Sequence, residues 1–159
     1  MVAVATVAQA HAPLPSRTLR LQLEHGRLQG LLRLHLPAAA ARVYAAAPDL
    51  GVALVPAALA GLRIGEAQAS VREARARRLP DGGVDAVILL DVGAAPSPLR
   101  IAVEAGPPLP IELLAASGVR LHLDDGPGSA IRGGLALRPR PGLPCVVSIT
   151  SPASPGTAR

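Results

Sequence analysis

The stretch RTLRLQLEHGRLQGLLRLHL, residues 17–36, decides the fold, because leucine alternates with polar residues on both sides of a two-residue break. The leucines of the two halves are Leu19, Leu21 and Leu23, and then Leu28, Leu32, Leu34 and Leu36. A period of two places these leucines on one face of a strand and the polar residues between them on the other. His25-Gly26 at the break is typical of a tight turn, so the stretch predicts a β-hairpin.

Similar short runs follow along the second half of the chain. They are VDAVILLDV (84–92), PLRIAVEAG (98–106), LPIELL (109–114), GVRLHLDDG (118–126), RGGLALRP (132–139) and LPCVVSIT (143–150). Glycine and proline separate these runs at regular intervals, which is typical of a β-sandwich or barrel. We expect an all-β fold, a mainly antiparallel, immunoglobulin-like β-sandwich, as a single domain over residues 13–150. Residues 151–159 are expected to form a disordered tail.

A helical insert interrupts the strands over about residues 37–62. This segment is rich in alanine, the strongest helix former, and is divided by Pro37, Pro48 and Pro56. We expect a short helix at 38–47, a loop over PDLGVALV (48–55) and a second helical turn after Pro56. Tyr44 is the only aromatic residue of the chain, and we expect it to pack the insert onto the sheet.

Residues 70–79 have two interpretations. Ser70 and Glu73 have the spacing of a capping box, which favours a helix that starts at Val71. The turn-forming sequence PDGG at 80–83, followed by the strand-like run 84–92, favours instead a hairpin whose first strand is 70–79. We favour the strand.

Residues 1–12, MVAVATVAQAHA, are predicted to be a truncated signal segment. Small residues at alternate positions allow cleavage after Ala10 or after Ala12. The second cut would leave Pro13 next to the scissile bond, so the first is favoured, and it would make His11 the amino terminus. We therefore expect a periplasmic or secreted protein. The alternative is a cytoplasmic chain with an alanine-rich arm, since a basic n-region is lacking.

The stretch AHAPLPSRTLRLQLEHGRLQGLLRL (10–34), the helical insert and GLRI (61–64) together resemble a known arrangement. They are similar to the exported extracytoplasmic β-domains of bacterial HupE/UreJ-type proteins and of similar small periplasmic proteins. The resemblance covers about the first half of the chain. It implies an exported β-domain near metal-handling systems. It does not carry over a transport function, because no apolar stretch approaches the ~20 residues of a membrane-spanning helix.

The formal net charge is +5, and every strongly basic residue is arginine. Such a charge is compatible with nucleic-acid binding. However, the arginines are scattered, and Arg72, Arg75, Arg77 and Arg78, the densest group, are interpreted as a solvated face. Aromatic platforms for stacking bases are also missing. We expect no nucleic-acid partner, whereas a protein partner of unknown identity is compatible with the sequence.

Sequence motifs of common enzymes and cofactor sites are absent, among them GxGxxG, GK[ST], HExxH, CxxC and GxSxG. The glycine-rich segment GPGSAIRGG (126–134) lies between two strands and is interpreted as a flexible hairpin loop. Cys145 shares a strand face with apolar residues and is expected to be a buried thiol. No catalytic residue and no resident cofactor are predicted. The favoured function is a non-enzymatic binding or structural domain.

A copper site is the alternative. In the predicted hairpin, residue 24 lies opposite residue 27, so His35 falls opposite about residue 16, near the start of the first strand. A mature terminus at His11 would offer an amino nitrogen and an imidazole nitrogen. Together with the ring of His35 these nitrogens form a ligand set that suits Cu(II).

Overall fold

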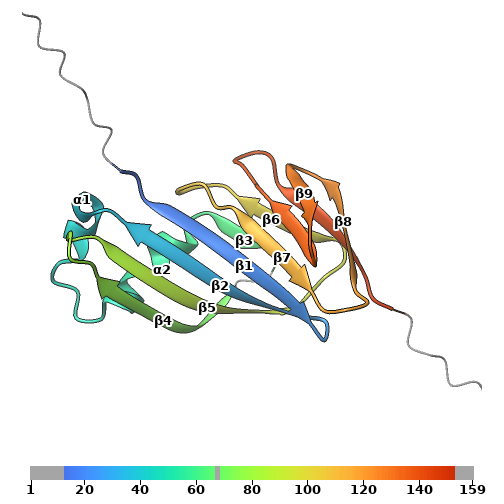
Figure 1. The fold of residues 1–159 in the computed structure, drawn as a ribbon, viewed down its shortest axis with the longest axis horizontal. Coiled ribbons are helices and arrows are strands. Elements are labelled where there is room, and N and C mark those ends of the chain that lie inside the picture. The colour runs from blue at the N-terminus through green and yellow to red at the C-terminus, as the bar shows by residue number, and fades with distance from the viewer. Residues whose placement is uncertain (1–12, 67–68, 153–159) are drawn as a thin grey trace, which may run out of the picture.

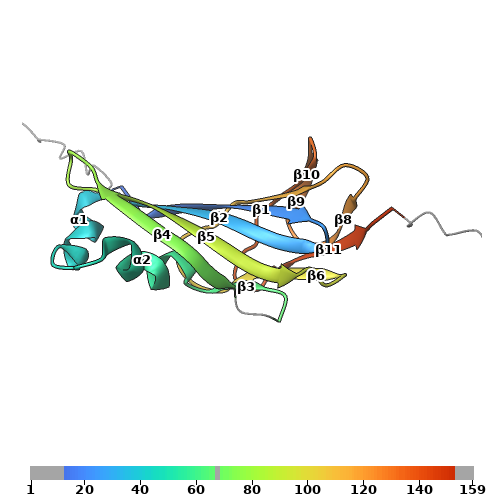
Figure 2. The same ribbon diagram turned by 90° about the horizontal axis from the view of Figure 1, so that it is seen from below.

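A computed structural model describes residues 13–66 and 69–152, and within them the chain forms two facing β-sheets with a small helical insert (Figures 1 and 2). The larger sheet contains, in spatial order, β4 (Ser70–Arg78), β5 (Val84–Ala94), β2 (Arg27–Leu36), β1 (Ser16–Glu24), β7 (Ile111–Ala115), β10 (Gly134–Leu137) and β9 (Gly128–Ile131). The smaller sheet contains β3 (Leu62–Ile64), β6 (Leu99–Val103), β11 (Cys145–Thr150) and β8 (Arg120–Asp125). The prediction of an all-β fold with a small helical insert is confirmed.

The hairpin of β1 and β2 has the predicted register, in which Glu24 pairs with Arg27 and Ser16 pairs with His35. Its turn has positive backbone φ angles at both central residues, 49° at His25 and 74° at Gly26. A turn with this geometry matches the twist of antiparallel strands. His35 therefore lies beside the start of β1, as the sequence predicts.

The strand interpretation of residues 70–79 is confirmed, because Ser70–Arg78 forms β4 and pairs antiparallel with β5. The PDGG turn closes this hairpin through hydrogen bonds from Gly82 N to Leu79 O at 3.0 Å and from Gly83 N to the Asp81 carboxylate at 2.8 Å. Ser70 and Glu73 have the spacing of a capping box but cap no helix, because residues 70–78 pair with the long β5 strand instead.

The order of the strands is only partly that of an immunoglobulin domain. Strands β4-β5-β2-β1 in one sheet, with β3-β6 in the other, follow the order of immunoglobulin constant domains. However, β7 pairs parallel with β1 in the larger sheet, while every other pairing is antiparallel among the described residues. The later strands then extend both sheets. The immunoglobulin-like assignment stays a prediction.

The helical insert differs from the expected one. Helix α1 (Ala38–Ala41) and the 3₁₀ turn η1 (Arg42–Tyr44) are shorter than the predicted helix at 38–47. The predicted loop over 48–55 is wrong, because α2 (Leu50–Leu59) begins before Pro56 and contains it. The Asp49 side chain starts α2 by accepting a hydrogen bond from Val52 N at 3.0 Å. Pro56 and Val52 are both exposed, so water can hydrogen-bond to the Val52 carbonyl that Pro56 leaves without a donor.

The core lies between the inner face of the larger sheet and the two layers that cover it. In Figure 2, the helices and the smaller sheet lie on the same side of the larger sheet. Helix α2 covers β4 and β5 and buries Leu54 and Ala58, while the smaller sheet covers the other end with residues such as Ile101 and Val147. Tyr44 packs against the core as expected. One face of the larger sheet is thus covered by protein, and the other, called here the outer face, is uncovered by any described residue.

Arg17 is the exception to the apolar core. It is 2% exposed, because the alternation of β1 turns it inward with the leucines. Its guanidinium donates hydrogen bonds to the carbonyl oxygens of Ala58 at 2.8 Å, Ala105 at 2.8 Å and Pro107 at 2.9 Å. Burial lowers the pKa of Arg17, and the three carbonyl dipoles offset part of the cost of burying its charge. The side chain ties the end of α2 to the segment between β6 and β7.

The glycine-rich segment 126–134 is more regular than predicted. Gly128–Ile131 forms β9, the exposed edge strand that pairs with β10. The interpretation as a flexible hairpin loop is therefore wrong for residues 128–131, because pairing with β10 orders them. In the part of the chain that the structure describes, no helix is long and apolar enough to cross a membrane.

Candidate functional site

The outer face of the larger sheet carries rows of side chains that come from neighbouring strands. Pairing of β1, β2, β5 and β4 aligns Ser16, His35, Asp85 and Arg77 in one row. The next row contains Thr18, Arg33, Val87 and Arg75. A third row contains Arg20, Leu31, Leu89 and Glu73. Residues far apart in sequence therefore meet on one surface, and the surface is both charged and apolar.

His35 and Asp85 form a hydrogen-bonded pair on the outer face. The Nδ1 atom of His35 lies 2.7 Å from Oδ1 of Asp85, and Arg77 lies 3.5 Å from the other carboxylate oxygen. An ionised carboxylate only accepts hydrogen bonds, so Nδ1 carries the proton and donates it. The hydrogen bond from His35 is the main reason that the pKa of Asp85 is below its usual range, although desolvation opposes it. Asp85 thus orients the His35 ring, whose Nε2 is the nitrogen left for another partner.

A hollow of about 470 Å³ lies beside this pair. Its lining includes Thr18, Arg33, His35, Arg75, Arg77 and Asp85, with Val87 between Arg33 and Arg75 in their row. We call it the first hollow. A volume of this size is in the range of small-molecule binding sites.

A second hollow of about 430 Å³ lies further along the same face, between β2, β1, β7 and β10. Its lining includes Arg20, Arg33 and Arg138, together with Glu112, which pairs with Arg20 at 3.1 Å. Arg33 lines both hollows. No described residue forms a hydrogen bond or an ion pair with the Arg33 side chain, in contrast to Arg20, Arg75 and Arg77.

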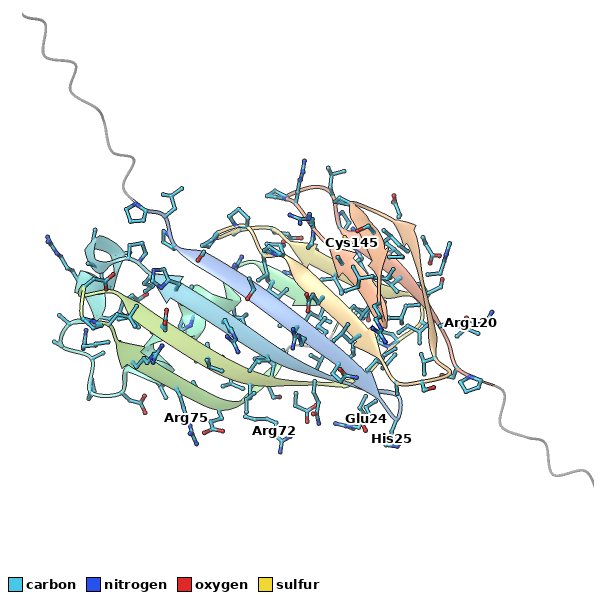
Figure 3. All side chains as sticks on the ribbon, in the orientation of Figure 1. Glu24, His25, Arg72, Arg75, Arg120 and Cys145 are labelled. Carbon is cyan, nitrogen blue, oxygen red and sulfur yellow. The ribbon has the colours of Figure 1, made fainter. Side chains whose placement is uncertain are left out.

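The arginine group of β4 is divided between two surfaces. Arg75 and Arg77 face the outer surface, where Arg75 pairs with Glu73 and Arg77 with Asp85. Arg78 turns to the helical side and donates a hydrogen bond to the Tyr44 carbonyl oxygen at 3.0 Å. Figure 3 shows Arg72 and Arg75 along the open edge of β4. All four arginines are exposed, as the interpretation as a solvated group expects, but they lie on two surfaces, and Arg75 and Arg77 line the first hollow.

Of the predicted copper ligands, the structure places only His35. His11 lies outside the described residues. Within those residues, no group of three histidine, cysteine or carboxylate side chains could hold a metal ion. The hydrogen bond of His35 to Asp85 is a feature shared with metal-binding histidines, which usually donate their other ring N–H to a carboxylate.

Cys145 is buried, as predicted, and its Sγ lies 3.2 Å from the Pro127 carbonyl oxygen. Burial raises the pKa of the Cys145 thiol, which disfavours the reactive thiolate. His25 at the hairpin tip and His122 on β8 are both exposed, and the nearest carboxylates, Glu24 and Asp124, lie 3.9 Å away.

Sequence reasoning missed Arg33, Asp85, Arg77 and Arg75 as members of the His35 site. The alternation of each strand shows that these residues face outward, as His35 does. The pairing of β2 with β5 decides that they meet, and this pairing joins residues about fifty positions apart, such as His35 and Asp85.

No protein-family model matches this chain, and no curated protein sequence matches it.

Proposed function

We propose that this chain is an exported, non-enzymatic binding module that holds its ligand on the outer face of the larger sheet. The observation that carries the proposal is the first hollow, where four strands bring cationic and apolar side chains together on the uncovered face. Concave sites with an apolar surface and a few convergent polar groups are typical of ligand binding.

Binding is favoured over nucleophilic catalysis by the contacts of His35. Such catalysis requires a nucleophile hydrogen-bonded to its base. Among the described residues, the His35 ring is hydrogen-bonded to Asp85, and no hydroxyl group is hydrogen-bonded to it. Ser16 and Thr18 are its nearest hydroxyl-bearing neighbours in the β1–β2 pairing.

The binding part of the proposal is tested by a fragment screen with ¹⁵N–¹H correlation spectra of the chain. We expect the amide shifts that fragments cause to cluster on the outward residues of β1, β2 and β5. Shifts that cluster on the smaller sheet or on α2, or no saturable shift with any fragment, would contradict the proposal.

The export part rests on the composition of residues 1–12 and on the resemblance to exported β-domains. Its test is the intact mass and amino-terminal sequence of the protein after expression with its native upstream region in a Gram-negative host. Export predicts a mature periplasmic protein that begins at His11. Retention of Met1 in the cytoplasm would overturn export and, with it, the copper alternative.

Copper binding by His11 and His35 is a second candidate, favoured by one observation. His35 pairs with Ser16 at the start of β1, and Asp85 holds its ring by Nδ1. Isothermal titration of the chain beginning at His11 with Cu(II) tests it. We expect His35→Ala to weaken binding and His122→Ala, the matched control on β8, to leave it unchanged. Equal affinities for the two variants would argue against the site.

A further inference from the structure

Among the arginines that line the first hollow, Arg33 is the one whose side chain has no hydrogen-bond or ion-pair partner among the described residues. Its neighbours in the first hollow have carboxylate partners: Arg75 pairs with Glu73, and Arg77 pairs with Asp85 at 3.5 Å. The only carboxylate that lines the first hollow, Asp85, is engaged by both His35 and Arg77. A positive charge therefore remains at Arg33, in the centre of the face and at the border of the two hollows.

Apolar side chains lie beside Arg33 on the side of β5 and in the next row. Val87 is its direct neighbour on β5 and is 39% exposed. In the next row Leu31 pairs with Leu89, which is 38% exposed. Exposure of outward valine and leucine side chains to water is unfavourable. A ligand that covers these side chains buries their apolar surface, and this burial stabilises the complex.

A ligand that satisfies both features needs one anionic group and a small apolar body. The planar guanidinium of arginine matches a carboxylate with two parallel hydrogen bonds. The first hollow, at about 470 Å³, has room for a molecule of small size only. Arg33 and Val87 are paired residues on neighbouring strands. A ligand whose anionic group binds Arg33 therefore has its apolar part next to Val87.

We infer that the first hollow binds a small amphiphilic carboxylate, with the carboxylate held by Arg33 and the apolar body lying over Val87. This inference rests on the proposed binding function and specifies its ligand class. Asp85 has a positioning role: it holds Arg77 and His35 at the wall of the hollow and leaves Arg33 to take the anion. The ordered ring of His35 lines the same hollow and limits the space on that side.

The inference is tested with three probes that share one hydrocarbon chain: hexanoate, hexan-1-ol and hexylammonium. Each is titrated into the ¹⁵N-labelled chain at constant ionic strength. We expect hexanoate to shift the amides of Arg33, His35 and Val87 saturably. Hexan-1-ol should bind there at least about tenfold more weakly, because it lacks the charge that Arg33 binds, and hexylammonium should not bind.

Two variants with the same net charge identify the anchoring residue. Arg33→Gln removes the proposed anchor, and Arg120→Gln removes an exposed arginine from β8, at the far end of the molecule (Figure 3). We expect Arg33→Gln to raise the Kd for hexanoate at least about tenfold and Arg120→Gln to change it less than about twofold. Arg33→Lys keeps the charge but loses the planar fork, so its Kd should lie between these values.

The possible results separate the ligand class from the binding face. If hexan-1-ol binds the outer face as tightly as hexanoate, the carboxylate assignment is wrong and the binding face stands. If Arg33→Gln and Arg120→Gln weaken hexanoate equally, the effect is one of net charge and the assignment to Arg33 is wrong. If no probe and no screened fragment shifts an outer-face signal, both the inference and the proposed function are wrong.

Discussion

The guanidinium of Arg17 donates a hydrogen bond to the carbonyl oxygen of Ala58 at 2.8 Å, although 41 positions separate the two residues in the sequence. Ala58 lies in the last turn of α2, where the helix dipole concentrates negative charge. The contact connects the first strand of the larger sheet with the helix that covers its inner face. It therefore fixes the position of α2 beneath β4 and β5.

Replacement of Arg17 by alanine should destabilise the protein strongly. The variant leaves a cavity in the core and removes the donor of three buried or partly buried carbonyl groups. We expect a loss of about 3 kcal/mol or more in the free energy of unfolding, measured by urea denaturation. Arg20→Ala is the matched control on the exposed side of β1, where loss of the Glu112 ion pair should cost less than about 1 kcal/mol. Similar losses in the two variants would refute the role of Arg17.

Loss of the Asp49 cap should destabilise α2. Its carboxylate satisfies the Val52 N–H, one of the donors that a helix start leaves without an intrahelical partner. We expect Asp49→Ala to reduce the free energy of unfolding by about 1 kcal/mol and Asp49→Asn to have little effect, because asparagine also caps helices. Thermal or urea unfolding of the two variants checks this expectation. An Asp49→Asn variant as unstable as Asp49→Ala would show that charge, and not the cap, is responsible.

Stability should fall in acid partly through Asp85. Its pKa is lower in the folded state than its ordinary value of 3.8. The ionised carboxylate thus stabilises the fold at pH values above 3.8, and this contribution is lost as the pH falls through the folded-state pKa. We expect the melting temperature of Asp85→Asn to change less between neutral and acidic pH than that of the unmodified protein. Asp81→Asn at the β4–β5 turn is the control. Parallel pH curves for Asp85→Asn and the unmodified protein would contradict the assignment.

The Cys145 thiol should react only when the protein opens. It is buried, and burial raises its pKa, so both access and thiolate formation are disfavoured. We expect Ellman's reagent to modify the native protein far more slowly than the urea-unfolded chain, with a rate that follows the opening of the smaller sheet. Fast modification of the native protein would mean that Cys145 is accessible and that the β11 packing is wrong.

Much of the fold was predictable because it depends on local chemistry. The alternating leucines of residues 17–36, with the positive-φ turn at His25-Gly26, determine the hairpin and its register, including the pairing of Ser16 with His35. The PDGG turn likewise determines the β4–β5 hairpin. These features involve residues close in sequence, so propensity and periodicity suffice to predict them.

The helical insert shows where local rules fail. Proline normally marks a helix start, and the sequence therefore predicted a turn after Pro56. Two features decide the actual helix: the cap at Asp49 and the close packing of Gly51 against β4, where a Cβ atom would lie 2.5 Å from the Ala74 carbonyl oxygen. Contact with β4 is a tertiary property that the local sequence does not reveal.

By itself, the sequence determined the strand-rich class of the protein, the two hairpins and the face on which each side chain of a strand lies. Only the tertiary structure showed that Arg17 lies on the inward side with the leucines, because it supplies the three carbonyl groups that accept its hydrogen bonds. The tertiary structure alone decided that Arg33, His35, Asp85 and Arg77 share one hollow. The physical reason is that β-strand periodicity is local, whereas the order of strands in a sheet depends on how distant segments bury their apolar faces together.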